Sequence, residues 1–529
     1  MDLFNYHRRP CRTVTVGGTV KIGGNNPIAV QSMTNTNTND VEGSVAQIGR
    51  IAAAGAPLVR LTAQGVREAE SIGRIRELVD VPLVADIHFN PEAAMAAAAA
   101  TDKVRINPGN FCHVGVSPEQ AMTPLLALCK EHGTALRIGV NHGSLSRSIM
   151  ERYGDTPEGM VESAMEFLRV CAAHDFHQVV VSIKASNVVV MVRTVRMLTE
   201  AMHRENLEYP VHLGVTEAGD GEDGRVKSAA GIGTLLAQGI GDTIRVSLSE
   251  DPELEVPVAR ALLQHIGSRA GAPQIDGAYA PGYDPMNPQR LRSRAIGSIG
   301  GDNVPAVYGL DTIDAEIVTV SASATDFTGI APDAVVLLTS AHTNAPGELQ
   351  AARHRMLIQG VDNPVIMQIS YDDTDAETLA IKAAADFGAI MLNGTADGIS
   401  IDSRAGLPTA SLALGILQAT RSRISKTEFI SCPSCGRTLF DLQATLKAVK
   451  SATAHLKGLK IGVMGRIVNG PGEMADADYG YVGAGPGRIS LYRRRECIVK
   501  NIPQEEAIER LVNLIKENGD WKDPDQTQP

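Results

Sequence analysis

Eight short runs of aliphatic and β-branched residues, each followed by a stretch with helical spacing, constrain the fold of this 529-residue chain most strongly. The stretches between the runs place apolar residues three and four positions apart, as amphipathic helices do. Strand–helix alternation predicts parallel strands joined by right-handed crossovers. Eight such units in about 240 residues match the size of a (β/α)8 TIM barrel. An open doubly wound sheet is the alternative. The predicted strands are 28–33, 58–62, 83–87, 103–107, 135–140, 178–183, 211–216 and 243–248.

The composition changes beyond residue 267, and this change predicts further domains. A Gly- and Pro-rich stretch without apolar periodicity follows, which is typical of a linker. Up to residue 425, predicted strands in DAVVLLTS, NPVIMQIS and AIMLNG alternate with helices, which predicts a second, barrel-like α/β domain. Its strand ends carry no concentration of cations, so we expect a spacer or oligomerisation role. The predicted domains are a TIM-barrel substrate domain at 1–267, an inserted α/β domain at 268–425 and an α+β domain at 426–529.

Composition and charge argue against several classes of protein. The chain has 49 basic and 60 acidic residues, a formal net charge of −11 and a single Trp, so it offers no general surface for nucleic acid. It contains no run of ~18 apolar residues that a membrane helix needs, and no signal-peptide core near residue 1. Its seven scattered cysteines do not form a secreted disulfide pattern. We therefore expect a cytoplasmic enzyme with no nucleic-acid or membrane partner.

Polar and cationic side chains gather at the predicted strand ends. The carboxyl ends of all barrel strands meet at one mouth, where the active sites of this fold lie. One arginine there is usually a surface salt bridge, but Arg or Lys occurs at five of the eight ends. Arginine binds phosphate through paired, planar N–H donors, so this mouth predicts a phosphorylated or diphosphorylated ligand. The candidate residues are Arg60, Asp86, His88, Arg105, Asn107, Arg137, Asn141, Lys184, Glu217, Arg245 and Ser247.

Two short motifs distinguish the C-terminal domain. Cys432 and Cys435 form C-P-S-C between a predicted strand and a predicted helix. Such a pair can be half of a zinc site, a redox dithiol, two iron–sulfur ligands or none of these. No second pair of this kind follows, which weakens a structural zinc site. The segment VNGPGEM predicts a tight turn that either presents the carboxylate of Glu473 or carries an ordinary solvated acid.

These motifs together resemble the family of 4-hydroxy-3-methylbut-2-enyl diphosphate synthases, over nearly the whole chain and in its long, three-domain form. The resemblance rests on VQSMT, VADIHF, RINPGN, RIGVNHGSL, SIKAS, GVTEAG, GIGDTIRVSLS, CPSCGRT and VNGPGE, in that order. It implies reductive opening and dehydration of 2-C-methyl-D-erythritol 2,4-cyclodiphosphate in the non-mevalonate isoprenoid pathway. Ferredoxin or flavodoxin would supply the electrons, and the assembly would be a homodimer. The resemblance assigns the cationic mouth and Asn469 to the substrate, and a proton-transfer role to Glu217.

The resemblance also implies a 4Fe–4S cluster held by three cysteines and one glutamate, the glutamate being the more exchangeable ligand. Cys432, Cys435 and Glu473 match three of the four positions, and Glu473 would act beside the reacting substrate. Arg466 stands where the family has its third cysteine, and a guanidinium cannot ligate iron. We therefore predict that the chain assembles the cluster poorly.

Three explanations of Arg466 remain open: a damaging substitution or sequence error, rescue by Cys497, or a family member that has lost both the cluster and the reaction. A cluster-free barrel enzyme of the pterin-binding or aldolase type is a further alternative. Such an enzyme would need neither the C-x-x-C pair nor VNGPGE.

Overall fold

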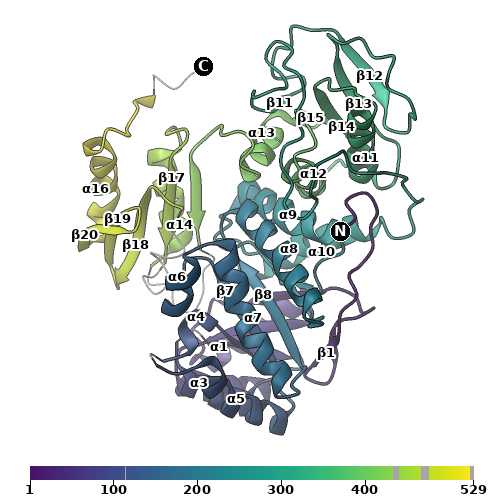
Figure 1. The fold of residues 1–529 in the computed structure, drawn as a ribbon. Coiled ribbons are helices and arrows are strands. Elements are labelled where there is room, and N and C mark those ends of the chain that lie inside the picture. Colours follow the sequence, from purple (N-terminus) through teal and green to yellow (C-terminus); the bar gives the residue numbers. More distant parts are fainter. Residues whose placement is uncertain (88, 114, 433–439, 466–475, 525–529) are drawn as a thin grey trace. The chain divides into compact units, whose positions relative to one another are not determined.

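The structure, a computed structural model (Figure 1), describes residues 1–87, 89–113, 115–432, 440–465 and 476–524. Its internal contacts divide the chain into two compact units. The barrel unit comprises residues 10–224, 241–260 and 426–529, and the middle unit comprises residues 1–9, 225–240 and 261–425.

The barrel unit contains eight parallel strands in the order β8-β7-β6-β5-β4-β3-β10-β9. A parallel bridge between Val181 and Val211 joins the two ends of this order, so the sheet closes on itself. All residues of β3 to β6 and of β8 are buried, as expected for strands covered on both faces. The predicted (β/α)8 barrel is confirmed. Its strands are β3 (Ala29–Met33), β4 (Leu58–Ala63), β5 (Leu83–Ile87), β6 (Lys103–Ile106), β7 (Ala135–Asn141), β8 (Val179–Lys184), β9 (His212–Leu213) and β10 (Thr243–Ile244).

The barrel helices begin at side chains that cap their first N–H groups. Asp40, Ser117 and Asn187, for example, each accept a backbone N–H of the first turn. These N-caps mark the points at which the βα loops end and the helices begin. The helices are α1 (Val41–Ala53), α2 (Val66–Arg76), α3 (Pro91–Ala100), α4 (Pro108–Phe111), α5 (Pro118–His132), α6 (Arg147–Tyr153), α7 (Pro157–Ala173), α8 (Val188–Arg204), α9 (Gly221–Ala237) and α10 (Glu255–Gly267), with a 3-10 turn at Pro252–Leu254.

An antiparallel hairpin that the sequence analysis did not predict covers the amino-terminal end of the barrel. It consists of β1 (Thr13–Val16) and β2 (Val20–Gly23). Its apolar side chains pack against residues at the starts of the barrel strands, among them Leu58 and Val84. One end of the barrel is therefore sealed by apolar packing, and the polar side chains gather at the other end.

The middle unit contains a five-stranded parallel sheet in the order β11-β15-β14-β13-β12. The predicted strand in AIMLNG is wrong, because Ala389–Leu392 form the last turn of α12 and continue its buried face. That helix ends before Gly394, which adopts the left-handed conformation (φ 66°). The elements are β11 (Ala306–Val307), β12 (Ile317–Ser321), β13 (Val335–Thr339), α11 (Ala345–Ile358), β14 (Val365–Tyr371), α12 (Ala376–Leu392), β15 (Gly398–Ser403) and α13 (Ala410–Ala419).

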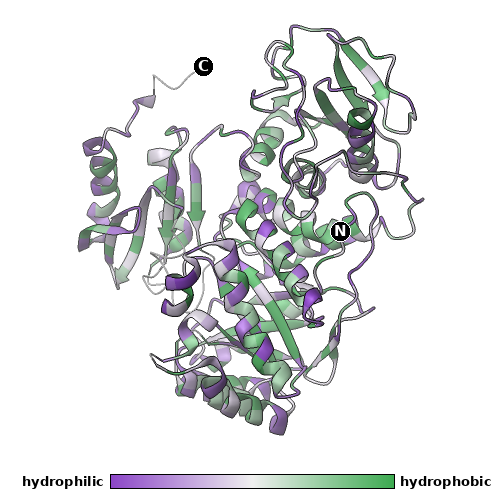
Figure 2. Cartoon of the chain, viewed as in Figure 1, coloured by the Kyte–Doolittle hydropathy of each residue, from purple (hydrophilic) through white to green (hydrophobic). Residues whose placement is uncertain are grey.

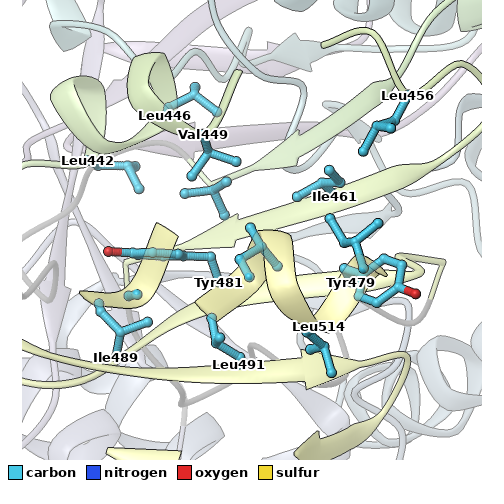
Figure 3. Packing of buried hydrophobic residues seen from close by; sticks show 14 residues of the cluster. Leu442, Leu446, Val449, Leu456, Ile461, Tyr479, Tyr481, Ile489, Leu491 and Leu514 are labelled. Carbon is cyan, nitrogen blue, oxygen red and sulfur yellow. The ribbon is translucent and has the colours of Figure 1, made fainter. Parts of the chain in front are cut away.

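The C-terminal domain is a mixed sheet with two helices on one face. Side chains from both helices, such as Leu446 and Leu514, pack with Tyr481 and Leu491 of the sheet (Figure 3). The next residues along the strands point the other way, as the period of two requires, and form a second cluster that Cys497 borders. The elements are β16 (Glu428–Ser431), α14 (Leu442–Thr453), β17 (Lys460–Met464), β18 (Tyr479–Gly485), β19 (Arg488–Arg493), β20 (Glu496–Pro503) and α16 (Gln504–Glu517).

Hydropathy follows this architecture. Figure 2 shows hydrophobic residues along β8 and hydrophilic residues on outward surfaces of helices such as α7 and α16. Within the described part of the chain, no helix combines the length and the apolar character needed to cross a bilayer.

Candidate active site

The five cationic side chains predicted at the barrel mouth are all buried there. They lie on β4, β6, β7 and β8 and just after β10. Burying a charge is costly unless an opposite charge or hydrogen bonds compensate it. The arrangement of these cations therefore depends on their partners. The five are Arg60, Arg105, Arg137, Lys184 and Arg245.

Two carboxylates hold two of the guanidinium groups in place. Asp86 on β5 accepts a hydrogen bond from NH1 of Arg105 at 3.0 Å. Glu255, at the start of α10, accepts from Nε and NH2 of Arg245 at 3.0 and 2.9 Å, a bidentate pair in which both side chains are buried. Arg60 lies 4.0 Å from Asp86 and also donates to the sulfur of Met33. Two of the five cations are thus fixed by the protein itself.

Arg137 lacks such a partner. It is 1% exposed, and its Nε and NH1 have no acceptor among the described residues. Burial, together with the nearby Arg60 and Arg105, holds its pKa below the usual value. Burial and then Arg137 and Arg60 likewise hold the pKa of Lys184 well below its usual value. An anionic ligand would form ion pairs with both cations and so relieve the repulsion between them.

Two glycines make room for the cations. A Cβ atom at Gly139 on β7 would lie 2.6 Å from Nε of Arg105. A Cβ atom at Gly214, after β9, would lie 2.7 Å from Nζ of Lys184. Any larger residue at either position would displace the cation, so the backbone itself shapes the mouth.

The remaining described candidates line the same strand ends. Asn107 donates to Oγ of Ser144 at 2.8 Å and caps the short helix α4. Asn141 accepts a hydrogen bond from Arg105 at 3.4 Å, and Ser247 is buried. Glu217 is buried and adopts the left-handed conformation (φ 49°), which is uncommon outside glycine and concentrates at functional sites.

Several predicted residues lie outside the described residues: His88, Cys435, Arg466, Asn469 and Glu473. Among the residues that the structure does describe, no group of three or more His, Cys, Asp or Glu side chains is arranged to hold a metal ion. Of the predicted cluster ligands, only Cys432 can therefore be placed.

Cys432 follows β16, and its surroundings link it to the barrel mouth. Its sulfur accepts the backbone N–H of Gly465 at 3.3 Å. Oγ of Ser249 donates to the carbonyl of Cys432 at 3.0 Å, and Ser431 forms a parallel bridge with Ala218. Ala218 directly follows Glu217, and Ser249 lies two residues beyond Ser247. Cys432 therefore lies beside the two loops that carry Glu217 and Ser247.

Ion pairs reinforce this contact between the C-terminal domain and the barrel. Lys450 pairs with Asp220, and Lys426 pairs with Asp223 at 2.5 Å. Farther around the mouth, Arg495 pairs at 2.7 Å with Asp155. Both domains belong to the barrel unit, so one chain brings Cys432 to its own barrel.

The sequence analysis missed several buried polar groups. Nζ of Lys103 on β6 and Nε2 of His212 on β9 have no partner among the described residues. A polar residue in an otherwise apolar strand is the signal that could have found them. Glu255 gives no such signal, because it lies on a helix ten positions beyond Arg245.

Comparison with known proteins places the chain among characterised families. The sequence model described as GcpE TIM-barrel domain matches residues 11–260, and that of the GcpE protein C-terminal domain matches residues 428–517. The chain is 50% identical to the 4-hydroxy-3-methylbut-2-en-1-yl diphosphate synthase (flavodoxin) of Parabacteroides distasonis, covering 98% of this chain and 100% of the relative. The protein of that name from Akkermansia muciniphila is 42% identical, with 98% of each chain covered.

Among solved structures, a dihydropteroate synthase from Stenotrophomonas maltophilia covers 50% of this chain and all of its own length. Its TM-score is 0.37 at 13% identity, a likeness too low to carry an argument.

Proposed function

Because the chain belongs to the GcpE family, we propose that it catalyses the reaction for which its relatives are named. It is an iron–sulfur oxidoreductase that converts 2-C-methyl-D-erythritol 2,4-cyclodiphosphate to (E)-4-hydroxy-3-methylbut-2-enyl diphosphate in isoprenoid biosynthesis. Flavodoxin, named for the relatives, is the proposed electron donor, and ferredoxin is the alternative. The observation that carries this proposal is the buried cationic mouth, in which Arg137 lacks a described acceptor.

The cyclic diphosphate supplies the charge that the mouth requires. Arg137 and Lys184 would bind phosphate oxygens directly, because neither forms an ion pair with a carboxylate among the described residues. Arg105, held by Asp86, would present a donor in a fixed orientation, as would Arg245. Side chains that are already held in position lose little conformational entropy when the ligand binds. Arg60, Asn107, Asn141, Ser247 and, outside the described residues, His88 and Asn469 would complete the site.

Glu217 is the proposed proton donor for the oxygen that leaves as water. It lies directly before Ala218, which pairs with the strand end that carries Cys432. A buried carboxyl group can hold a proton near neutral pH and release it to a leaving group in a closed site. Its left-handed backbone supports this role, because such strain persists where the surrounding structure holds a residue in a functional position.

The cofactor proposed from the resemblance is a 4Fe–4S cluster, which supplies electrons one at a time when bound. Cys432 fits as a ligand, because it is only partly buried and its sulfur accepts the N–H of Gly465, the kind of hydrogen bond that tunes cluster sulfurs. Cys435 and Glu473 suit iron by their chemistry. Arg466 does not, so the family's donor set is one ligand short in this chain. Cys497 borders the same apolar cluster as Cys432 and is the alternative fourth ligand.

We also propose a homodimer, on the family resemblance alone. Contacts of Ser431 and Cys432 with the barrel of the same chain support an active site that one chain completes. Light scattering coupled to size-exclusion chromatography gives the assembly directly, and a purely monomeric, active protein would rule the dimer out.

Substrate binding tests the proposed function without needing iron. We expect Arg137→Met to weaken binding of the cyclodiphosphate about 10- to 100-fold in calorimetry, because charge-assisted hydrogen bonds are lost. Arg193→Met is the matched control, since this arginine lies on the outer helix α8 and is 46% exposed. Equal affinities of the wild type and Arg137→Met would refute the assignment of the mouth.

A further inference from the structure

The middle unit contains a cavity of its own at the carboxyl ends of three neighbouring strands. It has a volume of about 430 Å³ and lies where β13, β14 and β15 end. The first turn of α11, the middle of α12 and the end of α10 complete its lining. Ligands of α/β proteins bind at this edge of the sheet, and the volume lies within the range of small-molecule sites. The sequence predicted a spacer or oligomerisation role for this part of the chain.

A buried carboxylate fixes one wall of the cavity. Asp386 on α12 accepts hydrogen bonds from the hydroxyl of Tyr371 at 2.9 Å and from Nε2 of His265 at 2.8 Å, and it pairs with Arg269. Three donors converge on one carboxylate, so these side chains hold each other in place. This wall is therefore preformed.

His342 supplies a donor that lacks an acceptor. Its Nδ1 accepts the backbone N–H of Asn344 at 3.0 Å, so the ring hydrogen must be on Nε2. That Nε2 atom is buried and has no partner among the described residues, although His342 lines the cavity. An unsatisfied buried donor is unfavourable, so an acceptor from a ligand would complete this position.

Two further features of the cavity lining favour an oxyanion. The helix α11 begins at Ala345, and its N-cap residue Asn344 makes no side-chain cap bond. Ala345 and Pro346 of its first turn line the cavity, so the positive end of the helix dipole lies beside it, while the carboxylate of Glu348 in the same turn accepts the hydroxyl of Ser340 at 2.6 Å. On α12, Lys382 donates to Asp373 at 2.6 Å, which uses one of the three hydrogens of the ammonium group.

The acidic side chains of the lining limit what else the ligand can carry. Asp373 and Asp372 lie at the end of β14, where Lys382 and Arg404 pair with them. Carboxylates accept hydrogen bonds, so they suit hydroxyl groups and disfavour a second negative charge. The cavity therefore matches a ligand with one anionic end and a hydroxylated remainder.

We propose that this cavity binds a small hydroxylated metabolite through a carboxylate or phosphate group, held by Nε2 of His342, the start of α11 and Lys382. The site is separate from the barrel mouth and does not depend on the function proposed above. All of its residues lie within the middle unit.

Isothermal titration calorimetry of the full chain tests the proposal. Inorganic phosphate and citrate are titrated separately, which distinguishes a phosphate site from a carboxylate site. His342→Asn keeps an acceptor near the Nδ1 position but removes the Nε2 donor, whereas His342→Gln keeps a donor near Nε2. Because the barrel mouth is also proposed to bind anions, Lys184→Met identifies the binding event that belongs to it. Thermal unfolding of each variant checks that the fold is intact.

We expect two binding events for at least one of the probes. His342→Asn should weaken one event about tenfold or more, His342→Gln should leave it within about threefold, and Lys184→Met should affect only the other. A single event that no His342 variant changes would overturn the proposal. A Lys184→Met variant with unchanged binding would instead count against the proposed function of the barrel mouth.

Discussion

Replacement of Gly139 by alanine should disable the barrel mouth through a single added methyl group. The new Cβ atom would lie 2.6 Å from Nε of Arg105 and 3.2 Å from Oγ of Ser182, so the arginine must move. This arginine cannot swing aside cheaply, because it is buried and bonds to Asp86 and to the carbonyl of Gly139 at 3.0 and 2.9 Å. The effect on folding and on ligand binding should therefore be large for so small a change.

The magnitude follows from the contacts that are lost. Overpacking of a tight interior by one methyl group costs about 1–3 kcal/mol of the free energy of unfolding. Displacement of one charge-assisted donor should weaken binding of the cyclodiphosphate about 10- to 100-fold. Denaturant unfolding measures the first quantity, and titration calorimetry on the protein without iron measures the second.

Gly49→Ala is the matched control, because it adds the same methyl group to an exposed position of α1 with no neighbouring atom within 4 Å. We expect that change to stabilise the protein by about 0.5–1 kcal/mol through helix propensity and to leave binding unchanged. If Gly139→Ala behaved like this control in both measurements, the described packing around Arg105 would be wrong.

Two further predictions concern the charges of the mouth. The pKa of Lys184 in the fold lies below its usual 10.5, so the unfolded chain binds more protons between the two values and the ligand-free protein gains stability as pH rises through that window. A bound diphosphate restores the ammonium form, so calorimetry in buffers of different ionisation enthalpy should show proton uptake in that window, and buffer-independent heats would contradict this. Glu255→Gln breaks the fully buried pair with Arg245 and should cost about 3–5 kcal/mol in denaturant unfolding. Glu253→Gln breaks the exposed pair with Arg50 and should cost under about 1 kcal/mol, and equal losses would disprove the distinction.

Much of the barrel could be predicted from sequence because parallel strands buried on both faces form continuous apolar runs. The predicted strand 83–87 coincides with β5, and the other strands before β9 agree within a residue at each end. The predicted strands 211–216 and 243–248 correspond to β9 and β10, which contain only two residues each. Beyond Leu213 and Ile244 the chain leaves the regular ladder and forms the segments that carry Glu217 and Arg245.

The candidate site, like the barrel, could be predicted only in part. The cations could be predicted because strand ends converge by topology, which needs no knowledge of distances. Their partners could not, since Glu255 comes from a helix and no pattern links it to Arg245. The cavity of the middle unit could not be predicted, because its lining residues, such as His265 and Arg404, are far apart in the sequence.

The most direct test of the proposed function compares the chain with Arg466→Cys after anaerobic reconstitution. Iron and acid-labile sulfide are measured, followed by turnover of the cyclodiphosphate with reduced flavodoxin. We predict that Arg466→Cys holds about four irons per chain and reduces the substrate, whereas the chain with Arg466 holds the cluster poorly. The chain with Arg466 could instead hold as much iron and be as active as Arg466→Cys. If the Cys497→Ser substitution then removed both the iron and the activity, Cys497 would be the fourth ligand. If neither protein binds iron or turns over the substrate, the iron–sulfur account is wrong.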